Sequence, residues 1–170
     1  HHAYATRTPH PHPHPHPHPH PSPSPSRHQA YEIIAAVRDN ERSVTEDAFM
    51  HILRLAGKHL KALPNVHRVT LAPGTKCTVV GDLHGQVEDL LHILDTCGAP
   101  DEHMVYVFNG DFVDRGSNSV EILSVLFALA CAFPDHVYLN RGNHEYEDVC
   151  VMYGFAKECK QKYSKSVFNM

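Results

Sequence analysis

The sequence has no excess of positive charge and no long apolar run, and these two absences exclude several classes of protein. Its 170 residues carry a formal net charge of −4 with histidine counted as neutral, which provides no basic field for a nucleic-acid backbone or an anionic membrane. The longest apolar stretch, Ile122 to Phe133, is interrupted by Ser124 and is too short to cross a bilayer, and no signal-peptide pattern opens the chain. We expect a soluble protein that binds neither nucleic acid nor a membrane.

Closely spaced cysteine pairs are also absent. The five cysteines are odd in number, show no Cys-x-x-Cys spacing and mostly fall inside apolar runs, where a thiol behaves as a small hydrophobe. This usage is typical of a reducing compartment, so we expect an intracellular protein of the cytoplasm or the nucleus. The chain begins with His1 rather than methionine, and we expect both of its ends to lie inside a longer natural sequence.

The N-terminal part of the sequence is a low-complexity tail. Residues 9–21 form a His-Pro repeat and residues 21–26 form a Ser-Pro repeat, neither with an apolar side chain to bury, so residues 1–27 are predicted to be disordered with polyproline character. The histidines suggest metal capture, but the alternating prolines hold the imidazoles apart. We therefore favour a tail that binds metal only loosely.

Residues 28–75 are predicted to form a helical region. One helical pattern covers residues 29–40, and a second opens with Ser43 as the capping residue and Glu46 three positions later. The second helix carries apolar residues at helical spacing until Pro64 ends the pattern: Phe49, Ile52, Leu53, Ala56 and Leu60. Such a stripe is most simply a packing face, and a partner-binding or inhibitory helix is the alternative.

From residue 76 onward the pattern changes to short strands that alternate with helices. Strands are predicted over residues 77–80, which should be buried, 104–108 and 136–139, and helices over residues 87–94, 118–132 and 149–163. This alternation predicts an α/β (α+β) fold with a largely parallel sheet that is covered by helices.

Each predicted strand runs directly into a polar cluster. The clusters are Gly81-Asp82-Leu83-His84-Gly85, Gly110-Asp111-Phe112-Val113-Asp114-Arg115-Gly116 and Arg141-Gly142-Asn143-His144-Glu145. Ligands bind at the carboxyl ends of the strands in open α/β sheets, so the three clusters are predicted to converge on one site. The first pattern alone arises by chance on the order of once in a thousand chains of this length, which makes three unrelated turns a poor explanation.

The side chains in these clusters suit a pair of metal ions. Asp82 and His84 would leave an extended backbone on the same side and hold one cation between a carboxylate oxygen and an imidazole nitrogen. Asp111 could bridge to a second cation, and Asn143 would ligate that second ion without adding negative charge. We therefore predict two divalent or trivalent metal ions, and manganese, iron and zinc all suit these ligands.

Three further residues are predicted to act on a phosphate group. His144 can donate a proton to a departing alkoxide, with Asp114 as the partner that holds its ring. Arg115 can clamp two phosphate oxygens with its planar guanidinium group. Arg141 and Glu145 are assigned first to ion pairs or backbone hydrogen bonds that hold the loop.

At these residues the sequence resembles the phosphoprotein phosphatase family of metal-dependent serine/threonine phosphatases. The matching stretches are Val80 to Gln86, Phe108 to Gly116 and Asn140 to Glu145, and Ser119-Val120-Glu121 and Tyr153-Gly154-Phe155 extend the match. Within the family, the tetratricopeptide-associated and EF-hand phosphatases are the most similar. The resemblance implies hydrolysis of phosphoserine and phosphothreonine in phosphoprotein substrates, a regulatory subunit or domain, and a metallophosphoesterase β-sandwich flanked by helices.

The resemblance also assigns roles to the same residues. It implies metal ligands at Asp82, His84, Asp111 and Asn143, a proton donor at His144 with its partner Asp114, and phosphate binding at Arg115. In the family, a later half of the catalytic domain supplies further metal-binding histidines and a second phosphate-binding arginine. We therefore expect residues 76–170 to form the N-terminal half of that domain, a partial sandwich, and the 170 residues alone to be inactive or poorly folded.

Two alternative functions stay open. The chain could come from a nucleotide or dinucleoside polyphosphate hydrolase of the same superfamily, which would share the metal cluster but not the substrate groove. It could also be a truncated product that binds partners without catalysis.

Overall fold

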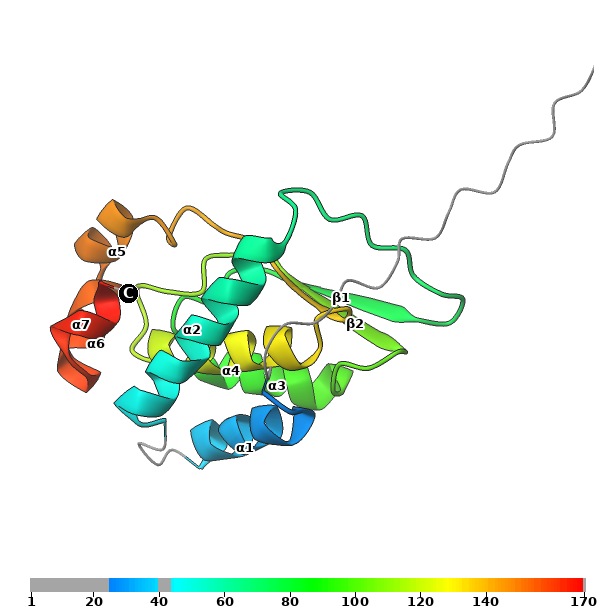
Figure 1. Ribbon diagram of the computed structural model, residues 1–170, viewed down its shortest axis with the longest axis horizontal. Coiled ribbons are helices and arrows are strands. Elements are labelled where there is room, and N and C mark those ends of the chain that lie inside the picture. Colours follow the sequence, from blue (N-terminus) through cyan, green and yellow to red (C-terminus); the bar gives the residue numbers. More distant parts are fainter. Residues whose placement is uncertain (1–24, 40–43, 170) are drawn as a thin grey trace, which may run out of the picture.

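In the computed structural model, which describes residues 25–39 and 44–169, three short strands lie side by side in one parallel sheet. They are β1 (Lys76–Val80), β2 (Met104–Phe108) and β3 (Val137–Leu139), in that order across the sheet (Figure 1). Val80 pairs with Phe108, and Phe108 pairs with Leu139, so the three strands end at the same level. The predicted α/β class with a parallel sheet is confirmed. The tail predicted to be disordered lies outside the described residues up to position 24.

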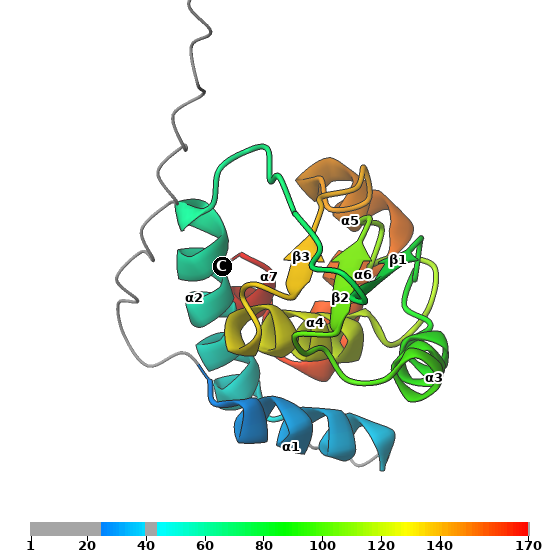
Figure 2. The ribbon, with the colours of Figure 1, turned by 90° about the vertical axis from the view of Figure 1, so that its right-hand side faces the viewer.

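Helix α4 (Ser119–Ala132) is the centre of the packing. Eleven of its 14 residues are buried. Helix α1 (Arg27–Arg38) packs against α4 on the side opposite the sheet, and α2 (Glu46–Ala62) and α3 (Val87–Cys97) also contact it (Figure 2). A helix surrounded in this way is apolar around its whole circumference, which explains the long apolar stretch in the sequence. In the described part of the chain, no helix has both the length and the apolar character needed to cross a membrane.

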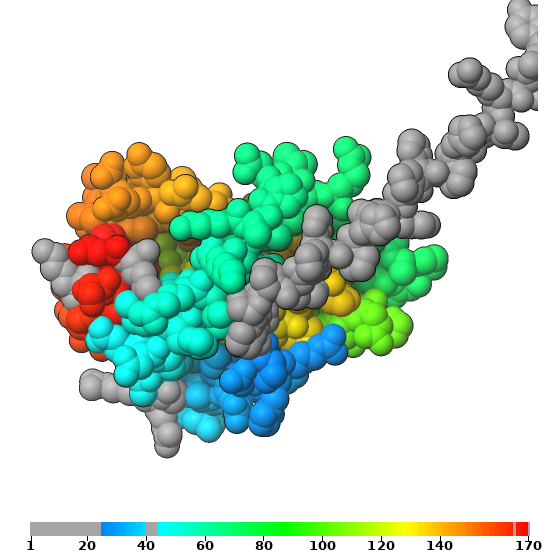
Figure 3. All heavy atoms as spheres, in the orientation of Figure 1, coloured from blue at the N-terminus to red at the C-terminus, as the bar shows by residue number. Residues whose placement is uncertain are grey.

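Helix α2 uses its apolar stripe as a packing face, as predicted. Phe49, Ile52 and Ala56 are buried, while Figure 3 shows the other side of α2 on the molecular surface. The predicted cap is wrong, because Thr45 rather than Ser43 is the residue whose side chain reaches the first turn: its hydroxyl accepts the N–H of Ala48 at 3.2 Å. Ser43 itself lies outside the described residues.

Helix α1 begins at Arg27, two residues before the predicted start. Ser26 and Gln29 form a capping box in which each side chain bonds the backbone of the other. This box satisfies two N–H groups at the beginning of the helix and fixes its first turn.

The single helix predicted over residues 149–163 is also wrong. The chain forms α5 (Glu147–Tyr153) and α6 (Phe155–Lys162), followed by the short α7 (Lys165–Phe168). Gly154 separates the first two with a φ of 127°, a backbone conformation that favours glycine and that an α-helix cannot contain. The three helices gather at one end of the molecule (Figure 1).

Strand β1 is less buried than predicted. It is an edge strand with a neighbour on one side only, and its Val79 side chain is 70% exposed. Cys77 on the same strand is exposed as well, so it does not act as a core hydrophobe. Cys131, Cys150 and Cys159 are buried in agreement with the expectation.

Candidate metal centre

The polar clusters form three loops at the edge where the strands end, and backbone hydrogen bonds join the first loop to the second. The carbonyl oxygen of Asp111 accepts the N–H groups of Leu83 and His84, both at 3.0 Å. The N–H of Gly116 donates to the carbonyl oxygen of His84 at 2.9 Å. These two loops, which are far apart in the sequence, therefore form one hydrogen-bonded unit.

The third loop is attached through the carboxylate of Glu145. Its Oε2 accepts the N–H groups of Asp111 at 2.8 Å and Gly142 at 2.9 Å, and its Oε1 accepts the N–H of Phe112 at 2.7 Å. Arg141 donates to the carbonyl oxygen of Glu145 at 3.1 Å. The backbone hydrogen bonds predicted for Arg141 and Glu145 are present: those from Asp111 and Phe112 to Glu145 join the second loop to the third, and that of Arg141 lies within the third loop.

Glycines at two contact points allow the loops to approach so closely. A Cβ atom on Gly110 would lie 2.2 Å from the backbone nitrogen of Gly142, and one on Gly85 would lie 2.8 Å from the backbone of Gly116. Gly110 and Gly85 also have φ values of 95° and 72°. A larger residue would therefore separate the loops and strain the backbone at the same time.

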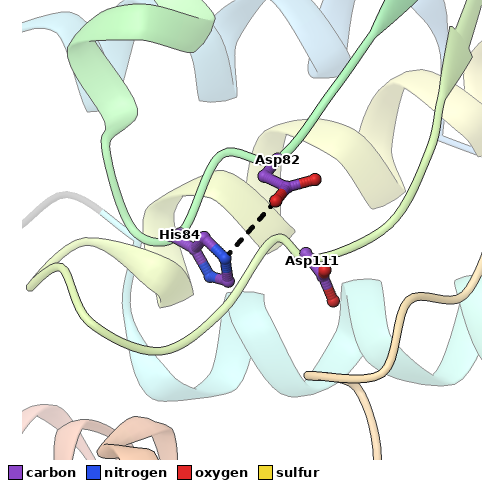
Figure 4. Close-up of side chains that lie close together, drawn as sticks. All are labelled: Asp82, His84 and Asp111. Atoms are coloured by element: carbon purple, nitrogen blue, oxygen red, sulfur yellow. Dashed lines mark ion pairs between the residues drawn. The ribbon is translucent and has the colours of Figure 1, made fainter.

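Asp82, His84 and Asp111 meet at the centre of this edge (Figure 4). Each offers one ligand atom, and the three atoms all lie within 4.8 Å of one another. Nε2 of His84 is 3.7 Å from Oδ2 of Asp82. The two residues approach through a turn at His84, whose φ is 40°, and not through the extended backbone that the sequence predicted.

The imidazole of His84 presents an unpaired nitrogen lone pair that can bind a cation. Its Nδ1 is 2.8 Å from the carbonyl oxygen of Val113, which can only accept, so Nδ1 carries the proton and Nε2 carries a lone pair. Nε2 is buried and has no hydrogen-bond partner among the described residues. A buried acceptor without a partner costs free energy that a ligand would recover. One imidazole nitrogen with two carboxylates therefore fits a divalent metal ion.

Asn143 lies on the third loop between two residues that contact Asp111. The N–H of His144 donates to Oδ1 of Asp111 at 2.9 Å, and a Cβ atom on Gly142 would lie 2.2 Å from the same oxygen. The backbone of Asn143 is therefore beside Asp111, and its role as a metal ligand stays a prediction.

His144 and Asp114 are in direct contact. Nδ1 of His144 is 2.8 Å from Oδ2 of Asp114, whose side chain is fully buried, and Oδ1 of Asp114 accepts the N–H of Phe155 at 2.8 Å. The ring of His144 also lies edge-on to that of His84, with 4.6 Å between their centroids. Nη2 of Arg115 is 3.4 Å from Nε2 of His144. The structure thus places these side chains beside the candidate metal ligands.

Four non-glycine residues in the described part of the chain have a positive φ, and all four belong to the predicted site. The values are 40° for His84, 55° for Asp111, 70° for Asp114 and 66° for Arg115. This conformation costs on the order of 1 kcal/mol for each non-glycine residue and persists only where the surroundings hold it. Such strain concentrates at functional sites, so it supports a function at these loops independently of the side-chain types.

The sequence did not predict that Tyr153 and Phe155 belong to the surroundings of the site. The ring of Tyr153 lies 5.3 Å from that of His144, and the N–H of Phe155 holds Asp114. The signal in the sequence is the triplet Tyr153-Gly154-Phe155, which extends the family match. The turn at Gly154 brings both neighbours to the site.

Comparison with known proteins identifies the same region. Residues 75–170 match the family described as calcineurin-like phosphoesterase. The serine/threonine-protein phosphatase with EF-hands 2 of Mus musculus is 50% identical over 114 residues, which are 67% of this chain and 15% of that protein. The serine/threonine-protein phosphatase rdgC of Drosophila melanogaster is 50% identical over 115 residues, which are 68% of this chain and 17% of that protein.

A third relative and a solved structure extend the comparison. Serine/threonine-protein phosphatase 5 of Arabidopsis thaliana is 41% identical over 131 residues, 77% of this chain and 24% of that protein. A protein serine/threonine phosphatase from Saccharomyces cerevisiae, described as similar to human phosphatase PP5, superposes with a TM-score of 0.75 at 35% identity over 82% of this chain and 46% of that one. The matched stretches cover 15% to 24% of the three relatives and 46% of the solved chain, so this chain spans less than half the length of each.

Proposed function

The chain belongs to the calcineurin-like phosphoesterase family, and on that premise we propose that its protein hydrolyses phosphoserine and phosphothreonine in protein substrates with two bound metal ions. The observation that carries the proposal is the placement of Asp82, His84 and Asp111 within 4.8 Å of one another beside the His144–Asp114 pair. The names of the relatives, which are serine/threonine phosphatases, support a protein substrate over a nucleotide.

The ligand set has four members in this chain. Asp82 and His84 would hold the first ion, Asp111 would bridge, and Asn143 would bind the second. When bound, the two ions would supply Lewis acidity toward the phosphate oxygens and lower the pKa of an attacking water. Manganese, iron and zinc each accept this mixture of oxygen and nitrogen ligands, and the proposal requires two ions without choosing among them.

His144 would protonate the leaving alkoxide. Its Nδ1–H donates to the buried carboxylate of Asp114, so Nε2 is the ring atom that points away from Asp114, and it lies beside Nη2 of Arg115. Because Asp114 is itself fixed by the N–H of Phe155, the ring cannot turn without breaking its hydrogen bond to a carboxylate that does not follow it. A fixed proton donor of this kind contributes to rate when it lies within hydrogen-bond reach of the leaving group.

Arg115 would bind the phosphate oxygens. Its side chain is exposed, and its guanidinium group lies on the Nε2 side of His144, where the departing oxygen would be. A guanidinium group can donate two parallel hydrogen bonds to a phosphate and stabilise its charge. The two residues would therefore act on opposite parts of the same substrate: Arg115 on the phosphate and His144 on the alkoxide.

A substrate panel tests the proposal. The full-length protein, supplied with manganese, is offered a phosphoserine peptide and diadenosine tetraphosphate at equal concentrations. Preferential release of phosphate from the peptide supports the protein phosphatase. Preferential cleavage of the dinucleotide would instead favour a nucleotide hydrolase with the same metal cluster.

The activity of the 170 residues alone is a separate question. We propose that they hydrolyse the peptide poorly, because the resemblance places further metal and phosphate ligands in a part of the catalytic domain that these residues do not include. Metal titration of the purified chain gives the answer: two tightly bound ions with turnover would refute this proposal, and one weakly bound ion without turnover would support it. We further propose that a regulatory domain or subunit acts on the complete protein, as the EF-hands in the name of the Mus musculus relative suggest.

A further inference from the structure

Helix α6 touches the loop of Asp114 and Arg115 and the beginning of α4 at four points, although α6 contributes none of the predicted site residues. At its first residue, the N–H of Phe155 donates to Asp114. In its middle, Oε1 of Glu158 accepts the N–H of Val120 at 3.0 Å. At its end, Lys162 contacts Ser117 and Glu121. The whole stretch from residue 114 to residue 121 is therefore fixed against one helix.

The first two contacts cap the N-terminal turns of α6 and α4. Neither helix has a capping side chain of its own, since Asn118 forms no cap hydrogen bond and Gly154 has no side chain. Asp114, which precedes α4, accepts from the N-terminal turn of α6, and Glu158 of α6 accepts from the N-terminal turn of α4. Carboxylates are favoured at both places because helix N-termini present unpaired N–H groups and partial positive charge.

The last two contacts come from a single ammonium group. Nζ of Lys162 lies 2.6 Å from the carbonyl oxygen of Ser117, 2.5 Å from Oε2 of Glu121 and 3.0 Å from Oε1 of Glu158. All three of its N–H groups are thus used, and its side chain is only 29% exposed. Glu158 is more buried still, so the loss of Lys162 would leave a buried carboxylate without its cation.

We propose that Glu158 and Lys162 are positioning residues for phosphate binding, because they hold the backbone that follows Arg115, at Val120 and Ser117. Arg115 has a φ of 66°, a conformation that a non-glycine residue keeps only when its neighbours are fixed. Asp114 is anchored before it and Ser117 after it, both to α6. The proposal rests on the proposed function, since it concerns how well Arg115 meets a substrate phosphate.

Steady-state kinetics on the full-length protein test this role. Lys162→Met should raise the KM for a phosphoserine peptide and the Ki for inorganic phosphate together, each on the order of tenfold, because one charge-assisted hydrogen bond changes an equilibrium constant by about that factor. The turnover number and the metal content should change much less. Lys162→Arg should restore most of the affinity, because it keeps the charge and the donors.

Two more variants complete the experiment. Lys160→Met removes the same charge from an exposed position on the same helix and should leave KM and Ki unchanged. Glu158→Gln keeps an amide oxygen for the N–H of Val120 but loses the charge, so it should shift KM in the same direction by a smaller factor. If Lys162→Met and Glu158→Gln lower only the amount of active enzyme while KM and Ki stay at the wild-type values, the positioning role is refuted. Absence of hydrolysis by the wild-type protein would refute the proposed function itself, and that result is visible before any variant is compared.

Discussion

The carboxylate of Glu145 offers the sharpest test of how the three loops are held. It accepts the N–H groups of Asp111 and Gly142 on Oε2 and the N–H of Phe112 on Oε1. Glu145→Ala would remove both acceptor oxygens and all three hydrogen bonds, and Glu145→Gln would remove one oxygen while keeping the shape. Because an amide nitrogen cannot accept, glutamine can satisfy either the two donors on one side or the single donor on the other.

The magnitude follows from the number of bonds and their exposure. A hydrogen bond to a charged group contributes about 1.5 to 3 kcal/mol, and the partial exposure of this site argues for the lower end. Water can also replace part of the loss, so Glu145→Ala should cost on the order of 3 kcal/mol for the opening of these loops. That free energy corresponds to an increase in amide exchange of on the order of a hundredfold. Glu145→Gln should cost about half as much.

Hydrogen exchange resolved to single amides on the full-length protein measures this directly. With Glu145→Gln we expect the amide of Phe112 to exchange faster while those of Asp111 and Gly142 stay protected, because the amide oxygen serves two donors in that orientation. Glu147→Gln is the matched control, since Glu147 is exposed in the first turn of α5. Unchanged exchange in both loops after Glu145→Ala would show that the carboxylate does not hold them.

Three other outcomes can be measured. His144→Ala should slow turnover by a factor of about 10² to 10⁴ with unchanged metal content by elemental analysis, whereas loss of both metals would contradict a role in proton transfer. Gly110→Ala should lower both thermal stability and metal content, because its Cβ would lie 2.2 Å from the nitrogen of Gly142; a variant with wild-type melting temperature and metal content would contradict this. Iodoacetamide should label exposed Cys77 within minutes and buried Cys150 only after unfolding. Burial raises the pKa of the Cys150 thiol from 9.0 to about 11. The neutral thiol therefore contributes to the stability of the native state below pH 9, and this contribution is lost as the pH rises through 11. Rapid labelling of native Cys150 at pH 8 would refute the buried thiol.

Much of the fold was predictable because hydrophobic runs and their boundaries are local properties of the sequence. The strand Met104–Phe108 was predicted to the residue, since an apolar run is followed by the polar Asn109 and Gly110. The break at Gly154 was not, because the apolar spacing continues on both sides of it and a single glycine is tolerated within helices. Only its φ of 127° distinguishes two helices from one.

The convergence of Asp82, His84 and Asp111 was predictable for a different reason. Parallel strands that alternate with helices must end at one edge, so residues that follow each strand meet whatever the intervening sequence is. The positive φ values of these loops, the capping of α6 by Asp114 and the capping of α4 by Glu158 were not predictable. Both depend on contacts between segments that share no local pattern, and a carboxylate such as Glu158 in a helix gives no sign of which distant N–H it will accept from.

The spacing of the candidate ligands along the chain has a consequence for folding. Asp82, Asp111 and Asn143 are each separated by a helical crossover, and each crossover must close before the next strand can pair. Long-range contacts of this kind cost chain entropy before they contribute any stabilisation, and they therefore slow folding. During synthesis, Asp82, His84 and Asp111 would leave the ribosome before Asn143, so an ion held by these three could bind once β1 and β2 have paired, whereas a second ion would require the complete sheet.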